Sequence, residues 1–354
     1  MSIRLKHLSA TAIVATLSLA FSSCGAIYDD QGDCDVYYRV RFVFDHNLSY
    51  ADAFAHEVES VSLYVFDADG RFVTQTTDRG YALAADGYTL PLPALEAGRY
   101  TLVAWCGLEG DNDSYEVPQL TAGRSTLTDL TCTLADRTRG DDGWAHVQEI
   151  DRLYHGLQTF DLLADEGTHT LTLPLVKNTK DVRIVLQHMS GQEVNVDDFL
   201  FTITDDNGRM AHDNTLLDDE LLVYEPWYTS QGTASLPDDN DPDAQMRAST
   251  SVSVAVAELS VNRLMAGQTA NPTTLTITRA QPEADGTHRT VLSIPLVDYA
   301  LLVKGHYNAQ MSDQEYLDRQ DEYNLTFFLD EDNNWLNTSI IINSWRVVLS
   351  DVEL

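Results

Sequence analysis

Basic residues are scarce in this chain. Its 354 residues include 22 lysines and arginines against 55 aspartates and glutamates, which gives a formal net charge of −33. Phosphate backbones and anionic lipid headgroups repel such a surface, so neither nucleic acid nor direct binding to an anionic bilayer is expected. Long apolar runs are missing too, because none beyond the N-terminal segment approaches the 18 residues of a membrane-spanning helix.

Cysteine is equally rare, with only Cys24, Cys34, Cys106 and Cys132. Their spacing does not match that of a zinc site. If Cys24 is modified, as argued below, the other three form at most one disulfide, and the sequence does not choose the pair. Cys106 lies in the apolar stretch LVAWCGL, so it is interpreted as a small buried side chain rather than a redox centre.

Sequence signatures of catalysis and cofactor binding are absent. The chain has no G-x-S-x-G, H-E-x-x-H, Walker or G-x-G-x-x-G pattern, and its histidines are scattered without a pair at metal-ligand spacing. His155, in LYHGL, is interpreted as a half-buried residue at a strand end rather than as a base. We therefore expect no enzymatic activity, no catalytic residues, no cofactor and no metal site.

The N-terminal segment is the clearest signal in the sequence. Two basic residues precede a stretch of apolar and small residues at 10–21, and two serines then lead directly to Cys24. This order is typical of a lipoprotein signal peptide, here residues 1–23, which is cleaved before a cysteine whose thiol carries a diacylglycerol. Phe21 departs from the leucine that is usual at its position. We expect lipidation of Cys24, and an ordinary secretory signal is the alternative.

Short alternating stretches rich in Val, Tyr, Phe, Thr and Ile dominate the rest of the chain, and turn residues such as Asp-Gly separate them. This pattern predicts an all-β fold built of β-sandwiches. Helical patterns are confined to residues 52–57 and 312–322, where Ser312 and Glu315 form a capping box. The expected strands are residues 36–44, 61–66, 88–92, 99–105, 168–173, 182–186, 199–203, 252–257, 274–278 and 291–294.

A short internal sequence repeat predicts two similar domains. Residues 58–73 (VESVSLYVFDADGRFV) and 196–211 (VDDFLFTITDDNGRMA) share an acidic start, an alternating strand and the pattern Asp-x-x-Gly-Arg. A boundary is expected near residue 165, with residues 161–167 as the linker. The predicted domains are residues 24–164 and 165–354.

Acidic residues within the two repeated segments could indicate calcium-binding loops. Asp67 and Asp69 in the first, and Asp205 and Asn207 in the second, resemble the start of a calcium loop, but neither segment has the glutamate required at position twelve. Tight hairpin turns explain both better. The acidic residues 230–250 are expected to form a surface loop within the second domain.

The end of the chain contains a further strand pattern. Residues 339–349 (SIIINSWRVVL) form a long apolar run without glycine or proline, and only five residues follow it. Such a strand is either covered within the second domain or left at an edge where a partner can pair with it. The sequence leaves both alternatives open.

Longer stretches combine into a pattern that covers nearly the whole mature chain. YYRVRFVFDHNLSYADAF, VESVSLYVFDADGRFV and GRYTLVAWCGL occur in the first half, and LTLPLVKNTKDVRIVLQ, the block at residues 296–330 and NNWLNTSIIINSWRVVL occur in the second. Together they resemble the fimbrial anchor lipoproteins of Bacteroidota, the FimB-type minor fimbrial subunits. Residues 110–124 and 230–248 carry no motif that aligns.

The resemblance implies two tandem transthyretin-like β-sandwich domains after the signal peptide. It also implies a subunit lipidated at Cys24 that sits in the outer membrane, faces outward, attaches or terminates a fimbrial polymer and supports adhesion. Asp29 and Asp30, close to the lipid, are associated with surface display. The implied partners are fimbrillin-type pilus subunits, joined by β-strand addition. A surface glycan-binding lipoprotein is the alternative, since such proteins share the signal and the β-sandwiches.

Overall fold

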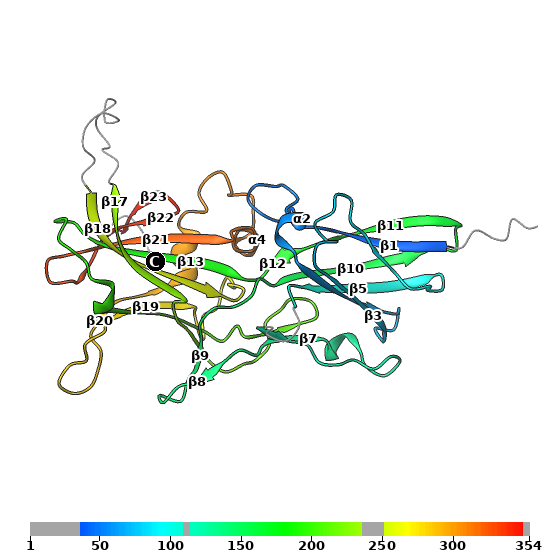
Figure 1. The fold of residues 1–354 in the computed structure, drawn as a ribbon, viewed down its shortest axis with the longest axis horizontal. Helices are drawn as coiled ribbons and strands as arrows, with labels where there is room; N and C mark the ends of the chain where they lie inside the picture. Colours follow the sequence, from blue (N-terminus) through cyan, green and yellow to red (C-terminus); the bar gives the residue numbers. More distant parts are fainter. Residues whose placement is uncertain (1–35, 109–113, 236–250, 350–354) are drawn as a thin grey trace, which may run out of the picture.

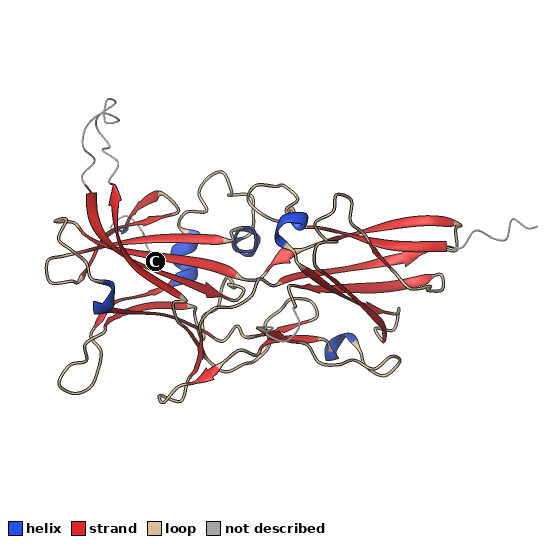
Figure 2. Ribbon diagram, viewed as in Figure 1, coloured by secondary structure: helices blue, strands red, loops and turns tan. Residues whose placement is uncertain are grey.

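The computed structural model describes residues 36–108, 114–235 and 251–349. Strands dominate the chain, with a few short helices (Figure 2), and several sheets lie along an elongated molecule (Figure 1). The expected all-β class is confirmed at this level. The predicted signal peptide, Cys24 and Cys34 lie outside the described residues. Within the described ranges, each helix is too short or too polar to cross a bilayer.

Two sheets at one end of the molecule pack face to face, and we call them the N-terminal sheet pair. One sheet has the strand order β11-β1-β4, and the other has the order β12-β10-β5-β2-β3. The helical turn α2 (Phe54–Glu57) follows β1. The strands are β1 (Val36–Val43), β2 (Ser60–Phe66), β3 (Phe72–Arg79), β4 (Leu90–Pro91), β5 (Gly98–Cys106), β10 (Tyr154–Leu162), β11 (Gly167–Pro174) and β12 (Val176–Lys177).

Side-chain alternation explains how these two sheets form a core. In β1, Val40 and Phe42 point into the space between the sheets, while Arg39 and Arg41 point away from it. Every residue of β2 is buried, because one of its faces lines this core and the other, which carries Tyr64, belongs to a larger core described below. The second sheet of the pair is therefore covered on both faces at its centre.

The remaining strands form the C-terminal sheets. A six-stranded sheet has the order β17-β18-β13-β21-β22-β23, another has the order β20-β19-β14-β16-β9-β8, and a small one has the order β15-β7-β6. The strands are β6 (Tyr115–Glu116), β7 (Thr131–Leu134), β8 (Thr138–Arg139), β9 (Ala145–Val147), β13 (Lys180–His188), β14 (Phe199–Asp205), β15 (Arg209–Ala211), β16 (Leu222–Tyr224), β17 (Tyr228–Ser235), β18 (Ser251–Val261), β19 (Thr274–Arg279), β20 (Thr290–Pro295), β21 (Glu322–Leu329), β22 (Trp335–Ile342) and β23 (Trp345–Val348).

A few short helices lie between the strands. The described helices beyond α2 are η2 (Leu127–Asp129), η3 (Val196–Asp198), α3 (Leu296–Leu301) and α4 (Asp313–Arg319). The expected N-cap of α4 is confirmed, because the Ser312 hydroxyl accepts a hydrogen bond from the Glu315 backbone N–H at 3.0 Å. The Glu315 carboxylate itself accepts from Arg319 one helical turn later.

The segment between β5 and β10 reaches from the N-terminal sheet pair to the C-terminal sheets. Within it, β9 pairs in parallel with β16, and β7 pairs antiparallel with β15. Figure 1 shows β7, β8 and β9 along the lower side of the molecule. Leu130 and Cys132 of this segment share one continuous core with Trp105 of β5 and Leu222 of β16. The outer face of the N-terminal sheet pair is thus packed against the rest of the chain.

The strand pairing shows where a division of the chain would run. Strand β11 pairs in parallel with β1 along its whole length, so residues 167–174 belong with the N-terminal sheet pair. Residues 163–166 only connect β10 to β11, and the expected linker at 161–167 was wrong because both of its ends lie in strands. The two-domain division at residue 165 stays a prediction. Because β11 and β12 both pair with strands of the N-terminal sheet pair, a boundary between domains would fall after β12.

Two other expectations need correction. Residues 230–235 belong to β17, so the expected loop at 230–250 begins too early, and residues 236–250 lie outside the described residues. Residues 339–349 do not form one strand. Asn343 and Ser344 have φ angles of 47° and 71°, and they turn the run into a hairpin of β22 and β23. This is the two-residue turn with positive φ at both positions.

Candidate functional site

A cleft opens where the N-terminal sheet pair meets the six-stranded sheet that contains β13, β18 and β21, and we call it the junction cleft. Its volume is about 670 Å³. Alternation in β13 builds one wall: Val182 and Ile184 pack into the core, so Asp181 and Arg183 face outward. The neighbouring strands β18 and β21 add Glu258, Ser260, Glu322 and Asn324 on the same face.

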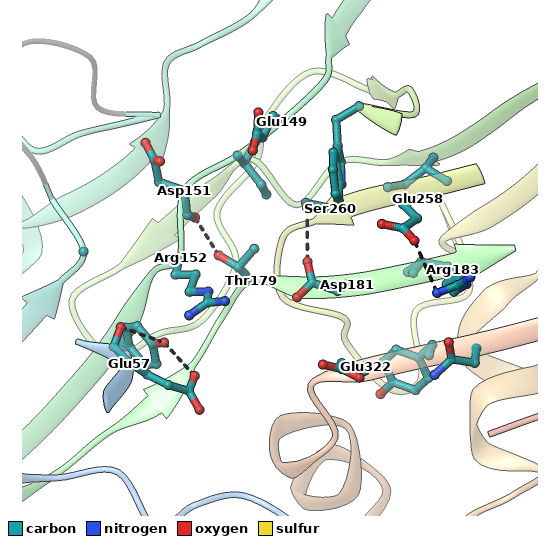
Figure 3. Close-up of a pocket in the computed structure, with 18 of the residues that line it drawn as sticks. Glu57, Glu149, Asp151, Arg152, Thr179, Asp181, Arg183, Glu258, Ser260 and Glu322 are labelled. Atoms are coloured by element: carbon teal, nitrogen blue, oxygen red, sulfur yellow. Dashed lines mark hydrogen bonds and ion pairs between the residues drawn. The ribbon is translucent and has the colours of Figure 1, made fainter. Parts of the chain in front are cut away.

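The opposite wall comes from the end of the N-terminal sheet pair and from the chain that leads into β10. Figure 3 shows the labelled side chains of the two walls on either side of a central space, into which Arg152 extends. The backbone of Arg152 packs directly against Gly107. This close approach requires a glycine, because Gly107 has a φ of +98° and a Cβ there would lie 1.8 Å from the Arg152 carbonyl oxygen. The residues of this wall are Glu57, Glu59, Gly107, Glu149, Ile150, Asp151, Arg152 and Tyr154.

Carboxylates outnumber cations in the junction cleft. Its two guanidinium groups belong to Arg152 and Arg183, and the second lies 3.5 Å from a Glu258 oxygen. The Ser260 hydroxyl donates to Asp181 at 3.1 Å. The carboxylates that line the cleft are those of Glu57, Glu59, Glu149, Asp151, Asp181, Glu258 and Glu322.

Several of these groups have no internal partner. Within the described ranges, the structure records no hydrogen bond or ion pair for the side chains of Glu149, Arg152 and Glu322. Tyr323 also lines the cleft, but its side chain lies in the core beside Val182, where its hydroxyl has no hydrogen-bond partner among the described residues. Glu149, Arg152 and Glu322 are exposed, so solvent hydrates their charged groups.

An exposed aromatic pair borders the cleft. Trp227 is 44% exposed and lines the cavity, and Tyr228 beside it is 48% exposed. Their ring centroids lie 5.9 Å apart. The backbone N–H of Trp227 donates to the Glu258 carbonyl at 3.1 Å, which holds the start of β17 against β18. The sequence reasoning missed this cleft, although the adjacent aromatics in EPWYTS were a signal for it.

A buried ionic cluster lies behind the cleft and holds α4 to the sheet. Lys180 is fully buried, and its Nζ donates to the Asp318 carbonyl at 2.9 Å and lies 3.5 Å from Asp321 Oδ1. Burial lowers the pKa of Lys180 to about 8, against the opposing effect of the nearby aspartates. Arg263 binds both carboxylate oxygens of Asp318, at 2.8 and 2.6 Å. These contacts are structural, since the cluster is shielded from solvent.

A free sheet edge lies at the C-terminal end of the described chain. In the described residues, β23 is the last strand of the six-stranded sheet. Trp345 is 63% exposed and Val348 is 45% exposed on this strand. The hairpin is anchored at its turn, where the Asn343 side chain accepts from the Asn324 backbone N–H at 2.8 Å. An apolar, unpaired edge of this kind is a template for another strand.

The four turn residues named from the sequence divide into two groups. Asp67 behaves as expected, because its carboxylate accepts from the Asp69 and Arg71 backbone N–H groups and Gly70 has a φ of +74°. Asp205 and Asn207 do not, and the expected hairpin there was wrong. After Asp205 the chain does not fold back on β14, since β15 pairs with β7 instead.

Asp205 and Asn207 are buried in a polar network. The Thr273 hydroxyl donates to Asp205, and burial raises the pKa of this carboxyl to about 7. The Tyr224 hydroxyl donates to Asn207 Oδ1 at 2.6 Å, and Asn207 Nδ2 donates to the Arg263 carbonyl at 3.2 Å. These side chains connect strands that the sequence could not bring together.

His155 and the two described cysteines are core residues. His155 is buried rather than half-buried, packs against Trp105 at 4.6 Å between ring centroids, and bonds through Nε2 to the His212 carbonyl. Burial lowers its pKa to about 4, so the ring is neutral at pH 7. Cys106 and Cys132 are buried free thiols, and burial raises the pKa of both. The interpretation of Cys106 as a small buried side chain is confirmed.

Comparison with known protein families identifies this architecture. Residues 31–351 match the family described as "Mfa2: Fimbrillin-A associated anchor proteins Mfa1 and Mfa2". The chain belongs to this family. The anchor family consists of non-enzymatic structural proteins, as the missing catalytic motifs suggested. Family membership implies a place at the cell surface or at the base of a fimbrium.

Individual relatives agree with the assignment. The minor fimbrium anchoring subunit Mfa2 of Porphyromonas gingivalis is 24% identical over 230 residues, which cover 63% of this chain and 67% of that protein. A candidate adhesin of Bacteroides thetaiotaomicron is 32% identical with a TM-score of 0.76, covering 90% of this chain and all of that one. The structure of the P. gingivalis fimbrial anchor protein Mfa2 has the same fold, with a TM-score of 0.62 at 17% identity over 89% of this chain and 99% of that one.

Proposed function

We propose that this chain is a lipid-anchored outer-membrane subunit that attaches, and can terminate, a fimbrial polymer at the cell surface. The observation that carries the proposal is the match of residues 31–351 to a family of fimbrial anchor proteins. The related subunit of P. gingivalis is named as a minor fimbrium anchoring subunit, which supports the same role here. Adhesion follows, because a fimbrium bears load only if its base is fixed to the cell.

The membrane attachment in this proposal is the lipid on Cys24. The order of basic, apolar and small residues before this cysteine supports cleavage after residue 23. Acyl chains contribute about 0.8 kcal/mol per buried methylene, so several chains on one cysteine anchor a protein stably. The N-terminal sheet pair and the C-terminal sheets are interpreted as tandem transthyretin-like β-sandwich domains, displayed outward from the outer membrane.

The contact with a fimbrillin-type subunit is proposed to be β-strand addition at β23. In the hairpin, Trp345 and Val347 face Ile342 and Ile340 as hydrogen-bonded pairs, so the N–H groups of Arg346 and Val348 point to the free side. A partner strand would bond to those groups. The exposed Trp345 would supply an apolar anchor beside it.

A proline substitution at the edge tests this contact. Arg346→Pro removes an outward N–H but leaves the bonds of β23 to β22, so the anchor should stay folded on the cell while fimbriae are shed. Arg346→Ala is the matched control and should retain fimbriae. The readout is fimbrillin in the medium against fimbrillin that co-purifies with the anchor from outer membranes. Normal retention by the proline variant would refute pairing at this edge.

A further inference from the structure

The buried ionic cluster behind the junction cleft contains an amine and a carboxyl group that the proposed attachment does not use. Lys180 is the first residue of β13, and Asp321 directly precedes β21. These two strands pair in parallel from Asp181 and Glu322 onward, and the Asp181 backbone N–H donates to the Asp321 carbonyl at 2.9 Å. The side chains of Lys180 and Asp321 therefore start from neighbouring positions on adjacent strands.

Strand alternation turns both side chains toward the core. Lys180 lies on the same face of β13 as Val182, and Asp321 lies on the same face of its strand as Tyr323. Lys180 is fully buried, and its Nζ lies 3.5 Å from Asp321 Oδ1. The hydrogen bond from Nζ to the Asp318 carbonyl, at 2.9 Å, fixes the position of the amine. One amine is thus held at contact distance from one carboxyl group inside the protein.

The carboxyl group at this contact lacks the hydrogen bonds that a buried group normally makes. In the part of the chain that the structure describes, neither the buried Asp321 Oδ1 nor the Tyr323 hydroxyl two residues later has a hydrogen-bond partner. Asp318, the other aspartate beside the amine, has both carboxylate oxygens bound by Arg263. Unpaired buried polar atoms are rare in proteins. Asp321 therefore offers Lys180 a carboxyl oxygen that no other described group binds.

Burial favours the neutral forms of both groups. It lowers the pKa of Lys180 to about 8 and raises the pKa of Asp321, and in both cases it outweighs the attraction between the two charges. The neutral amine is the nucleophilic form of lysine, and the un-ionised carboxyl group is the form that an amine can attack. Both shifts increase the population of the reactive pair. A buried pair of full charges, by contrast, is a weak source of stability.

We propose that Lys180 and Asp321 form an intramolecular isopeptide bond between Nζ and Cγ. The lysine nitrogen attacks Asp321 Cγ, a C–N bond forms as the C–O bond to the carboxyl hydroxyl breaks, and one proton from the nitrogen leaves with that hydroxyl as water. No oxidant, reductant or further reactant is consumed. Fixed proximity promotes the step, because groups held together in one molecule reach effective concentrations far above those in solution. The new N–H retains the bond to the Asp318 carbonyl, and the new carbonyl offers the Tyr323 hydroxyl an acceptor.

The bond links two strands at the junction of the molecule. Strand β13 follows β12, which pairs with the N-terminal sheet pair, and β21 lies beside the hairpin of β22 and β23. A covalent link between β13 and β21 resists their separation when load passes through this sheet. The ion pair is the unreacted state, so its free energy is the least that loss of Lys180 costs. The reaction does not depend on what the edge at β23 binds, so it is tested separately from the anchor function.

Peptide mapping by mass spectrometry tests the bond in the full lipoprotein, extracted in detergent and digested with trypsin. The tryptic peptides 178–183 and 320–346 should be recovered as one branched species, lighter than their sum by one water molecule and uncleaved after Lys180. Cleavage after Lys177 is the internal control, because this amine lies 3.6 Å from Glu57 Oε2, which already accepts from Tyr154, and should stay free. Recovery of the separate peptides 178–180 and 181–183, with no branched species, would overturn the proposal.

Two aspartate variants assign the partner of Lys180. Asp321→Ala removes the carboxyl group and should abolish the branched species, so the boiled, denatured chain should migrate differently on a gel from the cross-linked parent. Asp181→Ala is the matched control, since Asp181 faces outward and bonds to Ser260, and it should retain the branched species. A branched species that persists in Asp321→Ala would place the bond elsewhere and refute the assignment. The mapping of the parent chain is decisive even where a variant fails to fold.

Discussion

The buried hydroxyl of Tyr115 donates a hydrogen bond of 2.7 Å to Asn262 Oδ1, across 147 residues of sequence. Asn262 in turn donates through Nδ2 to the Asn207 carbonyl at 3.1 Å. Tyr115 belongs to the segment that crosses from β5 to the C-terminal sheets, and Asn262 directly follows β18. This polar chain fixes the crossing segment against the C-terminal core, where an apolar contact alone would leave its register undefined.

We expect Tyr115→Phe to destabilise the protein by about 1–2 kcal/mol, because Asn262 Oδ1 loses its partner in a buried site. Tyr81→Phe is the control, since Tyr81 is fully exposed. The free energy of unfolding from urea denaturation gives the comparison. Equal stability of the two variants would show that the hydrogen bond contributes nothing.

Lys180→Met should cost about 3 kcal/mol of unfolding free energy. The variant keeps the volume of the side chain but removes the bond to the Asp318 carbonyl and leaves Asp321 without its cation. Adding Asp321→Asn should recover part of this loss, since a neutral amide is cheaper to bury than an unpaired carboxylate. A double variant no more stable than the single one would show that Lys180 and Asp321 are not coupled.

Asp205 should make the stability depend on pH. Its pKa in the folded state is raised from 3.8 to about 7, so its contribution is fully present below pH 4 and is lost as pH rises through 7. The shift of about three units corresponds to roughly 4 kcal/mol. Asp205→Asn cannot ionise, so its stability relative to the parent should increase between pH 4 and 7 and level off above pH 7.

His155 acts in the opposite direction over the same pH range. Its pKa is lowered to about 4, so the stability it contributes is present above pH 6.5 and lost as pH falls through 4. Both proteins keep His155, so its effect cancels in the difference between parent and Asp205→Asn. A difference that stays constant from pH 4 to 8 would mean that Asp205 titrates normally.

Cys24→Ala should abolish lipid attachment and release the fimbriae from the cell. Metabolic labelling with palmitate measures the first effect, and fimbrillin in the medium measures the second. Cys106→Ala is a suitable control, because Cys106 is a buried thiol that should not carry lipid. Label retained in Cys24→Ala would disprove the assignment of the lipid to this residue.

Local sequence patterns determined much of the secondary structure. The alternation in residues 36–44 is sufficient to predict β1, because a side-chain period of two is a property of the single strand. Ser312 and Glu315 mark the start of α4 for the same reason, since a cap involves only neighbouring residues. The family, too, could be read from the chain, because its long motifs lie within contiguous stretches.

Only the tertiary structure determined which side chains and strands from distant parts of the chain come into contact. Asp205 and Asn207 have the same local pattern as Asp67 and Asp69, yet one pair is buried in a network and the other forms a hairpin turn. The difference arises because β15 pairs with β7, a strand from the other half of the chain. The junction cleft is of this kind as well, since Arg152 and Trp227 face one space only after the sheets have packed. Sequence patterns carry local periodicity, whereas long-range pairing depends on the burial that the whole core achieves together.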